Sequence, residues 1–317
     1  MRPTFLARLA TVLVAGALVA ACGGGQVQPF APTRVLAFGD ELSTIEADGR
    51  KYGINGYKQV TVNGTATDDL TTLDCTRLPI WIQTVAAGFR LTFDRCLGTA
   101  TAATGQVLAR PGQKVADFAA QVAAVQGVPF GEQDLALVMF GLNDILELYG
   151  RYTGANRDAL IGEARTRGAA LGGQVNALAQ RGPAVVVLTV PDIGLSPFAL
   201  AQNTASDTSR SKLISDLVAT FNNRMSVELI NDGRLIGLVY ADIEVQNNVK
   251  FKANYGLVNV TQAACQTSAV LPACTTASLV TGAGATTWLW ADSLLLSPAG
   301  QTRLGQLAES RARNNPF

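Results

Sequence analysis

The sequence contains no histidine among its 317 residues. Histidine is the side chain that most often takes a proton from a hydroxyl nucleophile near neutral pH, so a standard Ser-His-Asp mechanism is excluded. The absence also removes the imidazole ligands that many zinc sites use, and no metal site is expected. Any hydrolysis by this chain would have to rely on other side chains.

Charged residues are sparse as well, at 15% of the chain, with 25 Lys and Arg against 24 Asp and Glu. This balance gives none of the excess positive charge on which nucleic-acid binding depends, so no nucleic-acid partner is expected. No cofactor is expected either. The apolar content of 48% supports a sizeable buried core, in one large α/β domain or two small ones.

The N-terminal apolar run, Leu9 to Ala21, is too short to span a bilayer comfortably, and Arg2 and Arg8 precede it. A basic start, a short apolar stretch and small residues before a cleavage point are typical of a secretory signal peptide, here residues 1–21. Its removal takes away two arginines and no acidic residue, which leaves a net charge near −1.

The tetrapeptide at residues 19–22, Val-Ala-Ala-Cys, resembles a bacterial lipobox, which implies that Cys22 is lipidated and becomes the mature N-terminus. A glycine-rich tether at 22–32 and a domain at 33–317 are expected to follow. Gly23, in place of an aspartate, favours the outer membrane, on its periplasmic or surface face. The predicted location is therefore the bacterial cell envelope, with an N-terminal lipid anchor. An ordinary signal peptide with an incidental cysteine is the alternative.

Four further cysteines form an even set in a chain predicted to be exported, so disulfides are expected. Three connectivities are possible from the sequence, and the two sequence-local pairs are the simplest. Metal binding by these thiols is disfavoured because their spacings do not match CxxC patterns. The local pairs are Cys75 with Cys96 and Cys265 with Cys274.

Apolar runs without alternation predict strands buried on both faces, and segments with apolar residues every three or four positions predict helices between them. Alternation of the two types indicates a parallel sheet with right-handed crossovers. The last helix is expected to start at Pro298, with Ser297 as its cap. The predicted strands are Arg34–Phe38, Leu135–Phe140, Ala184–Val190 and Leu235–Tyr240; the helical stripes are Leu160, Ala164, Leu171, Val175, Leu178, then Leu213, Leu217, Phe221, Met225, Leu229, and finally Leu304, Leu307 and Ala308.

Two segments depart from this alternation. Residues 48–96 contain three glycines and a β-like run at Lys58–Val62, and are expected to hold a hairpin and a helix near Pro79–Phe89. Residues 249–287 are rich in small side chains and contain the second cysteine pair. We expect this second segment to overhang the functional site.

Three short segments carry the strongest functional signal: FGDELS at 38–43, GLND at 141–144 and ADSLLLSPAG at 291–300. In order and rough spacing they resemble the conserved blocks of the SGNH/GDSL hydrolases. In that family FGDS supplies the serine nucleophile, GxND an oxyanion-hole asparagine, and DxxH the general base with its orienting acid. The resemblance implies a three-layer α/β/α, flavodoxin-like fold with a site at the carboxyl ends of the strands.

The resemblance also identifies residues. Glu41 stands at the nucleophile position and Leu295 at the histidine position, while Asp292 keeps the position of the acid. Gly112, in RPGQKV, and Asn143 match the oxyanion-hole positions. The carboxylate of Glu41 is expected to lie in that anion hole and accept hydrogen bonds from Gly112 and Asn143; a solvated glutamate at a helix start is the alternative.

Other roles stay open for the neighbouring residues. Asp144 is expected to bond local backbone and Asp292 to cap a turn. A two-carboxylate or metal site built from these two residues and Glu41 is the alternative. Ser43 is a poor replacement nucleophile because two residues along a helix turn it about 200° away. Trp288 and Trp290 alternate, so they either line a ligand groove or pack in the core.

Three functions fit this sequence. The first is an envelope lipoprotein with an SGNH-like fold and a degenerate hydrolase site that binds acyl-ester, lipid or glycan ligands. The second is an active GDSL-like acylhydrolase that acts on ester bonds through an unconventional carboxylate mechanism. The third is a structural envelope partner with a vacant pocket.

Overall fold

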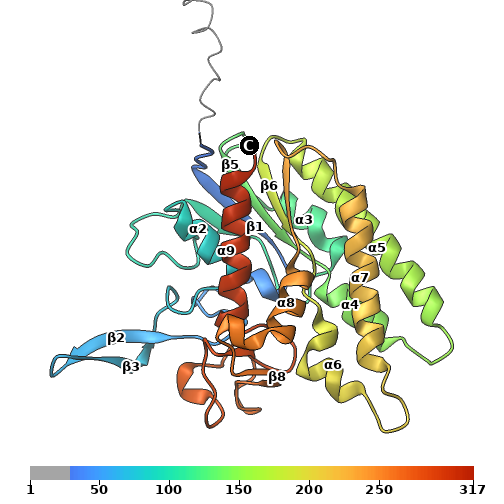
Figure 1. The fold of residues 1–317 in the computed structure, drawn as a ribbon. Helices are drawn as coiled ribbons and strands as arrows, with labels where there is room; N and C mark the ends of the chain where they lie inside the picture. Colours follow the sequence, from blue (N-terminus) through green and yellow to red (C-terminus); the bar gives the residue numbers. More distant parts are fainter. Residues whose placement is uncertain (1–28) are drawn as a thin grey trace, which may run out of the picture. The chain divides into compact units, whose positions relative to one another are not determined.

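A five-stranded parallel sheet forms the centre of the structure, a computed structural model that describes residues 29–317 (Figure 1). The spatial order is β4-β1-β5-β6-β7, and every neighbouring pair is parallel. This is the flavodoxin-like order of a doubly wound sheet. The predicted three-layer α/β/α class is confirmed. The strands are β1 (Arg34–Gly39), β4 (Gly105–Val107), β5 (Asp134–Met139), β6 (Ala184–Leu188) and β7 (Ile236–Val239).

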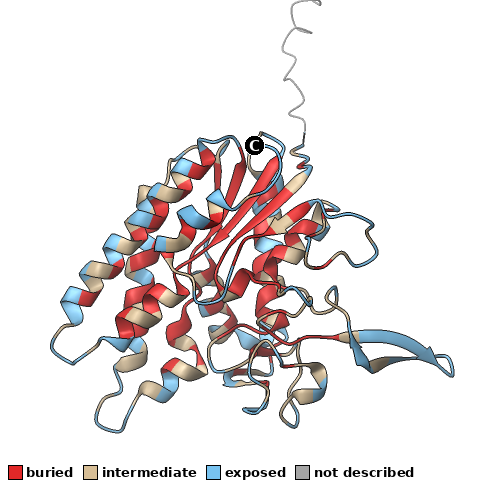
Figure 2. Ribbon diagram, turned by 180° about the vertical axis from the view of Figure 1, so that it is seen from behind, coloured by how far each residue is buried: buried red, intermediate tan, exposed pale blue. Residues whose placement is uncertain are grey.

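Helices cover both faces of this sheet. On one side lie α2 (Trp81–Gly88), α8 (Ala241–Lys250) and α9 (Pro298–Asn314) (Figure 1). A second set of three helices lies on the opposite side. All residues of β5 and β6 are buried, which explains why these strands read as continuous apolar runs (Figure 2). The helices of the second side are α3 (Phe118–Ala123), α5 (Arg157–Ala179) and α7 (Arg210–Glu228).

The predicted helical stripes are largely confirmed, with two exceptions. Leu229 follows the last residue of α7, where the chain turns to an extended conformation. Leu307 of α9 is 40% exposed although Leu304 and Ala308 are buried. At 100° per residue, the buried face of α9 is centred beyond Ala308, so Leu307 falls outside it. Ser297 caps α9 as expected, since its Oγ accepts from the Ala299 N–H at 3.1 Å.

The sequence did not reveal the edge strand β4. It has three residues, with Gln106 between two small apolar ones, and so shows no run of the predicted type. β6 and β7 are also shorter than expected, by up to two residues. Short edge strands leave little free backbone for pairing with other chains.

The expected hairpin and helix within residues 48–96 are both present. β2 (Tyr57–Val62) and β3 (Thr65–Leu73) pair antiparallel and project away from the sheet, with nearly every residue exposed (Figures 1 and 2). Asn63 and Gly64, at φ of 49° and 80°, form the two-residue turn between them. Such a turn needs positive φ at both positions, which Asn-Gly supplies.

The second irregular segment packs around Ile54 and the two tryptophans. It contains a 3-10 turn at Lys252–Tyr255, β8 (Asn259–Ala263) and a further 3-10 turn at Thr276–Ser278, and β8 pairs with β9 (Trp288–Trp290). Trp288 is 8% exposed and Trp290 is fully buried, with its indole N–H on the Val260 carbonyl at 2.9 Å. The tryptophans are core residues, so the ligand-groove alternative is wrong.

Two disulfides join the sequence-local cysteine pairs. Cys75 bonds Cys96 across a separation of 21 residues, and Cys265 bonds Cys274 across 9. The first fastens the loop before α2 to the loop that precedes β4. The second closes the segment that packs on Ile54.

Loss of the longer disulfide should lower stability measurably. A closed loop of this length reduces the conformational entropy of the unfolded chain, which stabilises the folded protein by about 3 kcal/mol. Cys75→Ser with Cys96→Ser should therefore reduce the free energy of unfolding by about that amount. Denaturant titration of the oxidised protein and the variant would measure it. Cys265→Ser with Cys274→Ser is the matched control, with a slightly smaller loss. Unchanged stability in both variants would contradict the assignment of the bridges.

None of the helices within residues 29–317 combines the length and apolar character that a membrane span requires. The signal peptide predicted at 1–21 and the lipidation predicted at Cys22 lie outside these residues.

Candidate functional site

Two neighbouring strands deliver the candidate residues to the carboxyl edge of the sheet. Glu41 begins a 3-10 turn, η1 (Glu41–Ser43), just after β1, and Asn143 lies in the first turn of α4 (Leu142–Gly150), just after β5. The strand order reverses at β1, because β4 lies on one side of it and β5 on the other. A doubly wound sheet forms its ligand crevice at this point. The topology alone therefore marks the place of both residues.

The carboxylate of Glu41 lies between the two donors that the sequence indicates. The backbone N–H of Gly112 donates to Oε1 at 2.7 Å, and Nδ2 of Asn143 donates to Oε2 at 2.8 Å. Backbone and carboxamide donors of this kind stabilise a negative charge, as in an oxyanion hole. Here each donor binds a different oxygen of one protein carboxylate. The structure brings Glu41, Gly112 and Asn143 together, and Glu41 is partly exposed at the start of η1.

Two hydrogen bonds from Nδ2 hold the side chain of Asn143. Its Nδ2 also donates to the carbonyl of Gln113 at 3.1 Å, which ties α4 to the loop that carries Gly112. Gly141 precedes α4 at φ of 124°, and a Cβ there would lie 2.5 Å from Val190. Only glycine fits this turn, so the spacing of GLND follows from packing as well as from any chemistry.

Asp144 fastens the same loop more deeply. Its carboxylate accepts from the Val115 N–H at 2.9 Å and from Arg167 of α5 at 3.1 Å. Burial raises the pKa of Asp144, and these two donors oppose that rise. The prediction that Asp144 bonds local backbone is wrong, because its partners are the backbone of Val115 and the side chain of Arg167, both distant in the sequence. Arg167 also binds Glu147 and Glu163, at 2.6 and 2.7 Å.

Side chains from distant segments of the sequence hold the end of β1 in place. No local sequence pattern predicts these contacts. Gln121 of α3 binds both polar atoms of the Gly39 backbone, at 3.0 and 2.8 Å. The indole N–H of Trp81 donates to Oγ of Ser43 at 3.1 Å. Ser43 is fully buried in this contact. Its hydroxyl therefore contacts Trp81 inside the core, which agrees with the prediction that it is a poor replacement nucleophile.

Asp40 is a buried acid beside Glu41. Its Oδ1 accepts from the Leu42 N–H at 3.1 Å, and Oδ2 has no hydrogen-bond partner within residues 29–317. Burial, and next the negative charge of Glu41, raise the pKa of Asp40 well above its usual range. The protonated form is thus favoured in the folded protein more than in the unfolded chain.

This raised pKa predicts a pH dependence of stability. The contribution of Asp40 to the free energy of unfolding is fully present below its pKa in the unfolded chain, near 3.9. It is lost as the pH rises through its pKa in the folded protein. Asp40→Asn stays neutral and keeps the acceptor. At pH 8 its free energy of unfolding should therefore exceed that of the wild type by about 1–3 kcal/mol, and at pH 4 the two values should be close. Asp158→Asn, at a side chain 98% exposed, is the control. A difference that does not change with pH would contradict the argument.

Asp292 and Leu295 form a closed turn after β9. The carboxylate of Asp292 accepts from the N–H groups of Leu294 and Leu295, at 2.8 and 2.6 Å. Burial raises the pKa of Asp292. Leu295 is 5% exposed, as an apolar side chain in a buried place should be. The carboxylate of Asp292 therefore caps its own turn, as the sequence predicts.

The polar groups near Glu41 limit the chemistry that this arrangement can perform. Tyr52 lies near Glu41 and has its pKa raised to about 12 by burial and by a hydrogen bond to Glu46, so it remains a neutral phenol. A neutral phenol is no general base at neutral pH. Within residues 29–317 no three acidic or cysteine side chains cluster as metal ligands, and Asp144 and Glu41 have separate partners. The geometry favours holding a charge over transferring a proton.

By its strand order and by the placement of these blocks, the chain resembles the SGNH/GDSL hydrolases. No protein-family model and no curated protein matches the sequence. Among solved structures it is similar to an extracellular lipase from Streptomyces rimosus, at 18% identity and a TM-score of 0.43, over 89% of this chain and 100% of the lipase.

Two other solved structures show comparable likeness. A lipase/acylhydrolase from Enterococcus faecalis has 13% identity and a TM-score of 0.41, over 88% of this chain and 95% of that one. An acetylxylan esterase from Geobacillus stearothermophilus has 14% identity and a TM-score of 0.39, over 90% and 96% of the two chains.

Proposed function

We propose that this chain is a non-catalytic member of the SGNH/GDSL hydrolases, an envelope lipoprotein that binds ligands instead of cleaving esters. The observation that carries the proposal is the position of Glu41. Its carboxylate accepts from Gly112 and Asn143 at hydrogen-bonding distance, so the protein itself occupies the point where an ester oxygen would have to develop charge.

The missing groups support the same conclusion. Position 41 carries no hydroxyl or thiol, the nearest serine is buried against Trp81, and the chain has no histidine. A carboxylate that already accepts two hydrogen bonds from the hole is a weak nucleophile and leaves no donor free for the substrate. Acyl-ester, lipid or glycan ligands are the class that such a fold would hold. The predicted lipid anchor would keep the protein at the cell envelope.

Ester turnover tests this proposal. We expect the purified protein to hydrolyse p-nitrophenyl acetate and butyrate no faster than a heat-denatured sample, because loss of both nucleophile and base removes several orders of magnitude of rate. Glu41→Ala and Asp292→Ala should give the same background rate. Turnover in the wild type that disappears in either variant would instead establish an acylhydrolase with a carboxylate mechanism.

A further inference from the structure

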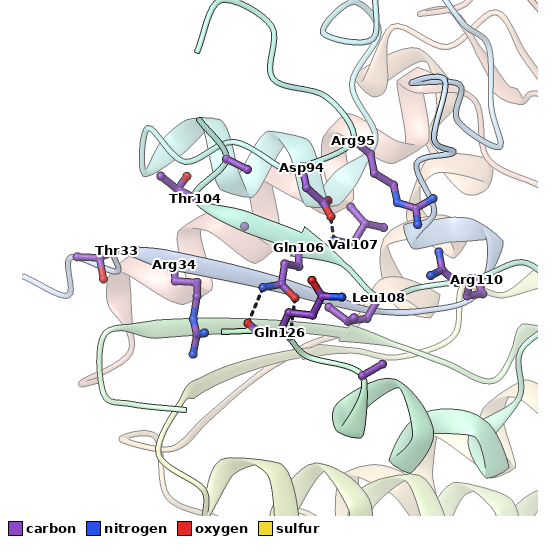
Figure 3. A pocket seen from close by; sticks show the side chains of 13 residues that line it. Thr33, Arg34, Asp94, Arg95, Thr104, Gln106, Val107, Leu108, Arg110 and Gln126 are labelled. Carbon is purple, nitrogen blue, oxygen red and sulfur yellow. Dashed lines mark hydrogen bonds between the residues drawn. The ribbon is translucent and has the colours of Figure 1, made fainter. Parts of the chain in front are cut away.

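A trough along the edge strand β4 lies outside the candidate site. It has a volume of about 630 Å³ and is bounded by the segment 94–104 on one side and by residues 124–126, after α3, on the other (Figure 3). Its floor is fixed by Gln106, whose amide donates to the Gln126 carbonyl at 2.8 Å and accepts from the Gln126 N–H at 3.0 Å. Hydrogen bonds within the protein therefore define the shape of the trough at the β4 edge of the sheet.

Two arginines meet at one end of this trough. The guanidinium groups of Arg95 and Arg110 point toward one another in Figure 3. Within residues 29–317 neither forms an ion pair: Arg95 donates only to the Ile45 carbonyl, at 3.3 Å, and no bond is found for the side chain of Arg110. Arg34, at the other end, differs because Asp134 neutralises it at 2.5 Å. The unpaired charge is thus concentrated at one end.

The remaining lining mixes polar side chains with apolar ones such as Val107 and Leu108. Thr33, Thr104 and the side chain of Gln126 border the trough, and Asp94 accepts from the Val107 N–H through one oxygen, at 3.1 Å, which leaves the other for a further donor. Hydroxyl, amide and carboxylate groups suit a ligand that carries many hydroxyls.

We propose that the trough binds an acidic saccharide, with a carboxylate or phosphate of the sugar between Arg95 and Arg110. Guanidinium groups offer planar pairs of N–H donors that match either oxyanion, and an anion between them relieves the repulsion of two like charges. Asp94 would accept sugar hydroxyls next to the anion. The site shares no residue with the Glu41 contacts, so it does not depend on whether the chain hydrolyses esters.

Isothermal titration of the purified chain in neutral detergent tests the proposal. Trigalacturonate should bind at least tenfold more tightly than neutral maltotriose, and more weakly as salt is raised. Arg95→Gln with Arg110→Gln should weaken trigalacturonate binding at least tenfold. Arg165→Gln, at an exposed arginine of α5, should leave it unchanged. Thermal unfolding of each variant shows whether it is folded.

Two further measurements, with a sugar phosphate and with phosphatidylglycerol vesicles, separate the sources of the anion. A sugar phosphate that binds with the same dependence on the two arginines would support the site, since carboxylate and phosphate both fit the paired N–H donors of a guanidinium group. Binding of neutral and acidic sugars with equal affinity, or an unchanged affinity in a folded double variant, would overturn it. Binding to phosphatidylglycerol vesicles without binding to either acidic sugar would also overturn it, because the ligand would then be a lipid surface.

Discussion

The double variant Glu41→Ser, Leu295→His is expected to hydrolyse p-nitrophenyl butyrate at least about a hundredfold faster than either single variant. A serine at position 41 would replace the carboxylate that now meets Gly112 and Asn143, which frees both donors for an oxyanion. A histidine at position 295 would follow Asp292 at the family spacing. Nucleophile and base act as a unit, so each change alone should leave the background rate.

The size of the gain depends on how well the turn at Asp292 accepts the new ring. A misplacement of about 1 Å can cost a hundredfold, so a modest rate is expected from an unoptimised site. Adding Asp292→Ala to the double variant should lower its rate at least tenfold, because the acid would orient the imidazole. Equal rates in the double variant and Glu41→Ser alone, with all variants folded, would mean that position 295 does not face position 41.

Cys22→Ser is expected to change the location of the protein completely. If Cys22 carries lipid, the wild type should partition with membranes, and the variant should appear as a soluble or unprocessed form. The anchoring energy of acyl chains, about 0.8 kcal/mol per buried CH₂, makes this an all-or-none difference when more than one chain is attached. Membrane fractionation and the intact mass of the protein measure both consequences.

A matched control is available in the same chain. Ala21→Ser also introduces a serine, at the neighbouring residue, but it keeps the thiol of Cys22. This variant should remain with the membranes. An unmodified N-terminus at another residue in the wild type would refute lipidation at Cys22. The esterase prediction would be unaffected by that result, since it concerns the domain alone.

Much of the fold could be read from the sequence because its central strands are buried on both faces. Continuous apolar runs such as β5 and β6 can be recognised without knowledge of their neighbours. β4 could not, because three residues at a sheet edge have no period of their own. The exposed Leu307 shows a related limit: heptad-like spacing gives a face but does not say where its centre lies.

The contact of Glu41 with Asn143 could be anticipated because two short motifs place these residues at adjacent strand ends, whereas the contact with Gly112 was implied by the family resemblance. Sequence order fixed which loops meet there, and a carboxylate needs donors wherever it is partly buried. The supports of the site were missed for the opposite reason. Gln121 and Arg167 act from helices far along the chain, and a lone glutamine or arginine on a helix carries no signal of its distant partner.

The most direct test of the central claim is the backbone amide signal of Gly112 in nuclear magnetic resonance spectra. If Glu41 fills the anion hole, Glu41→Ala should move the Gly112 amide proton strongly upfield, since a charge-assisted hydrogen bond is lost. Added acetate should reverse that shift in the variant, as a free carboxylate enters the vacated hole, and should leave the wild type unchanged. A Gly112 signal that is the same in both proteins, with no response to acetate, would contradict the account.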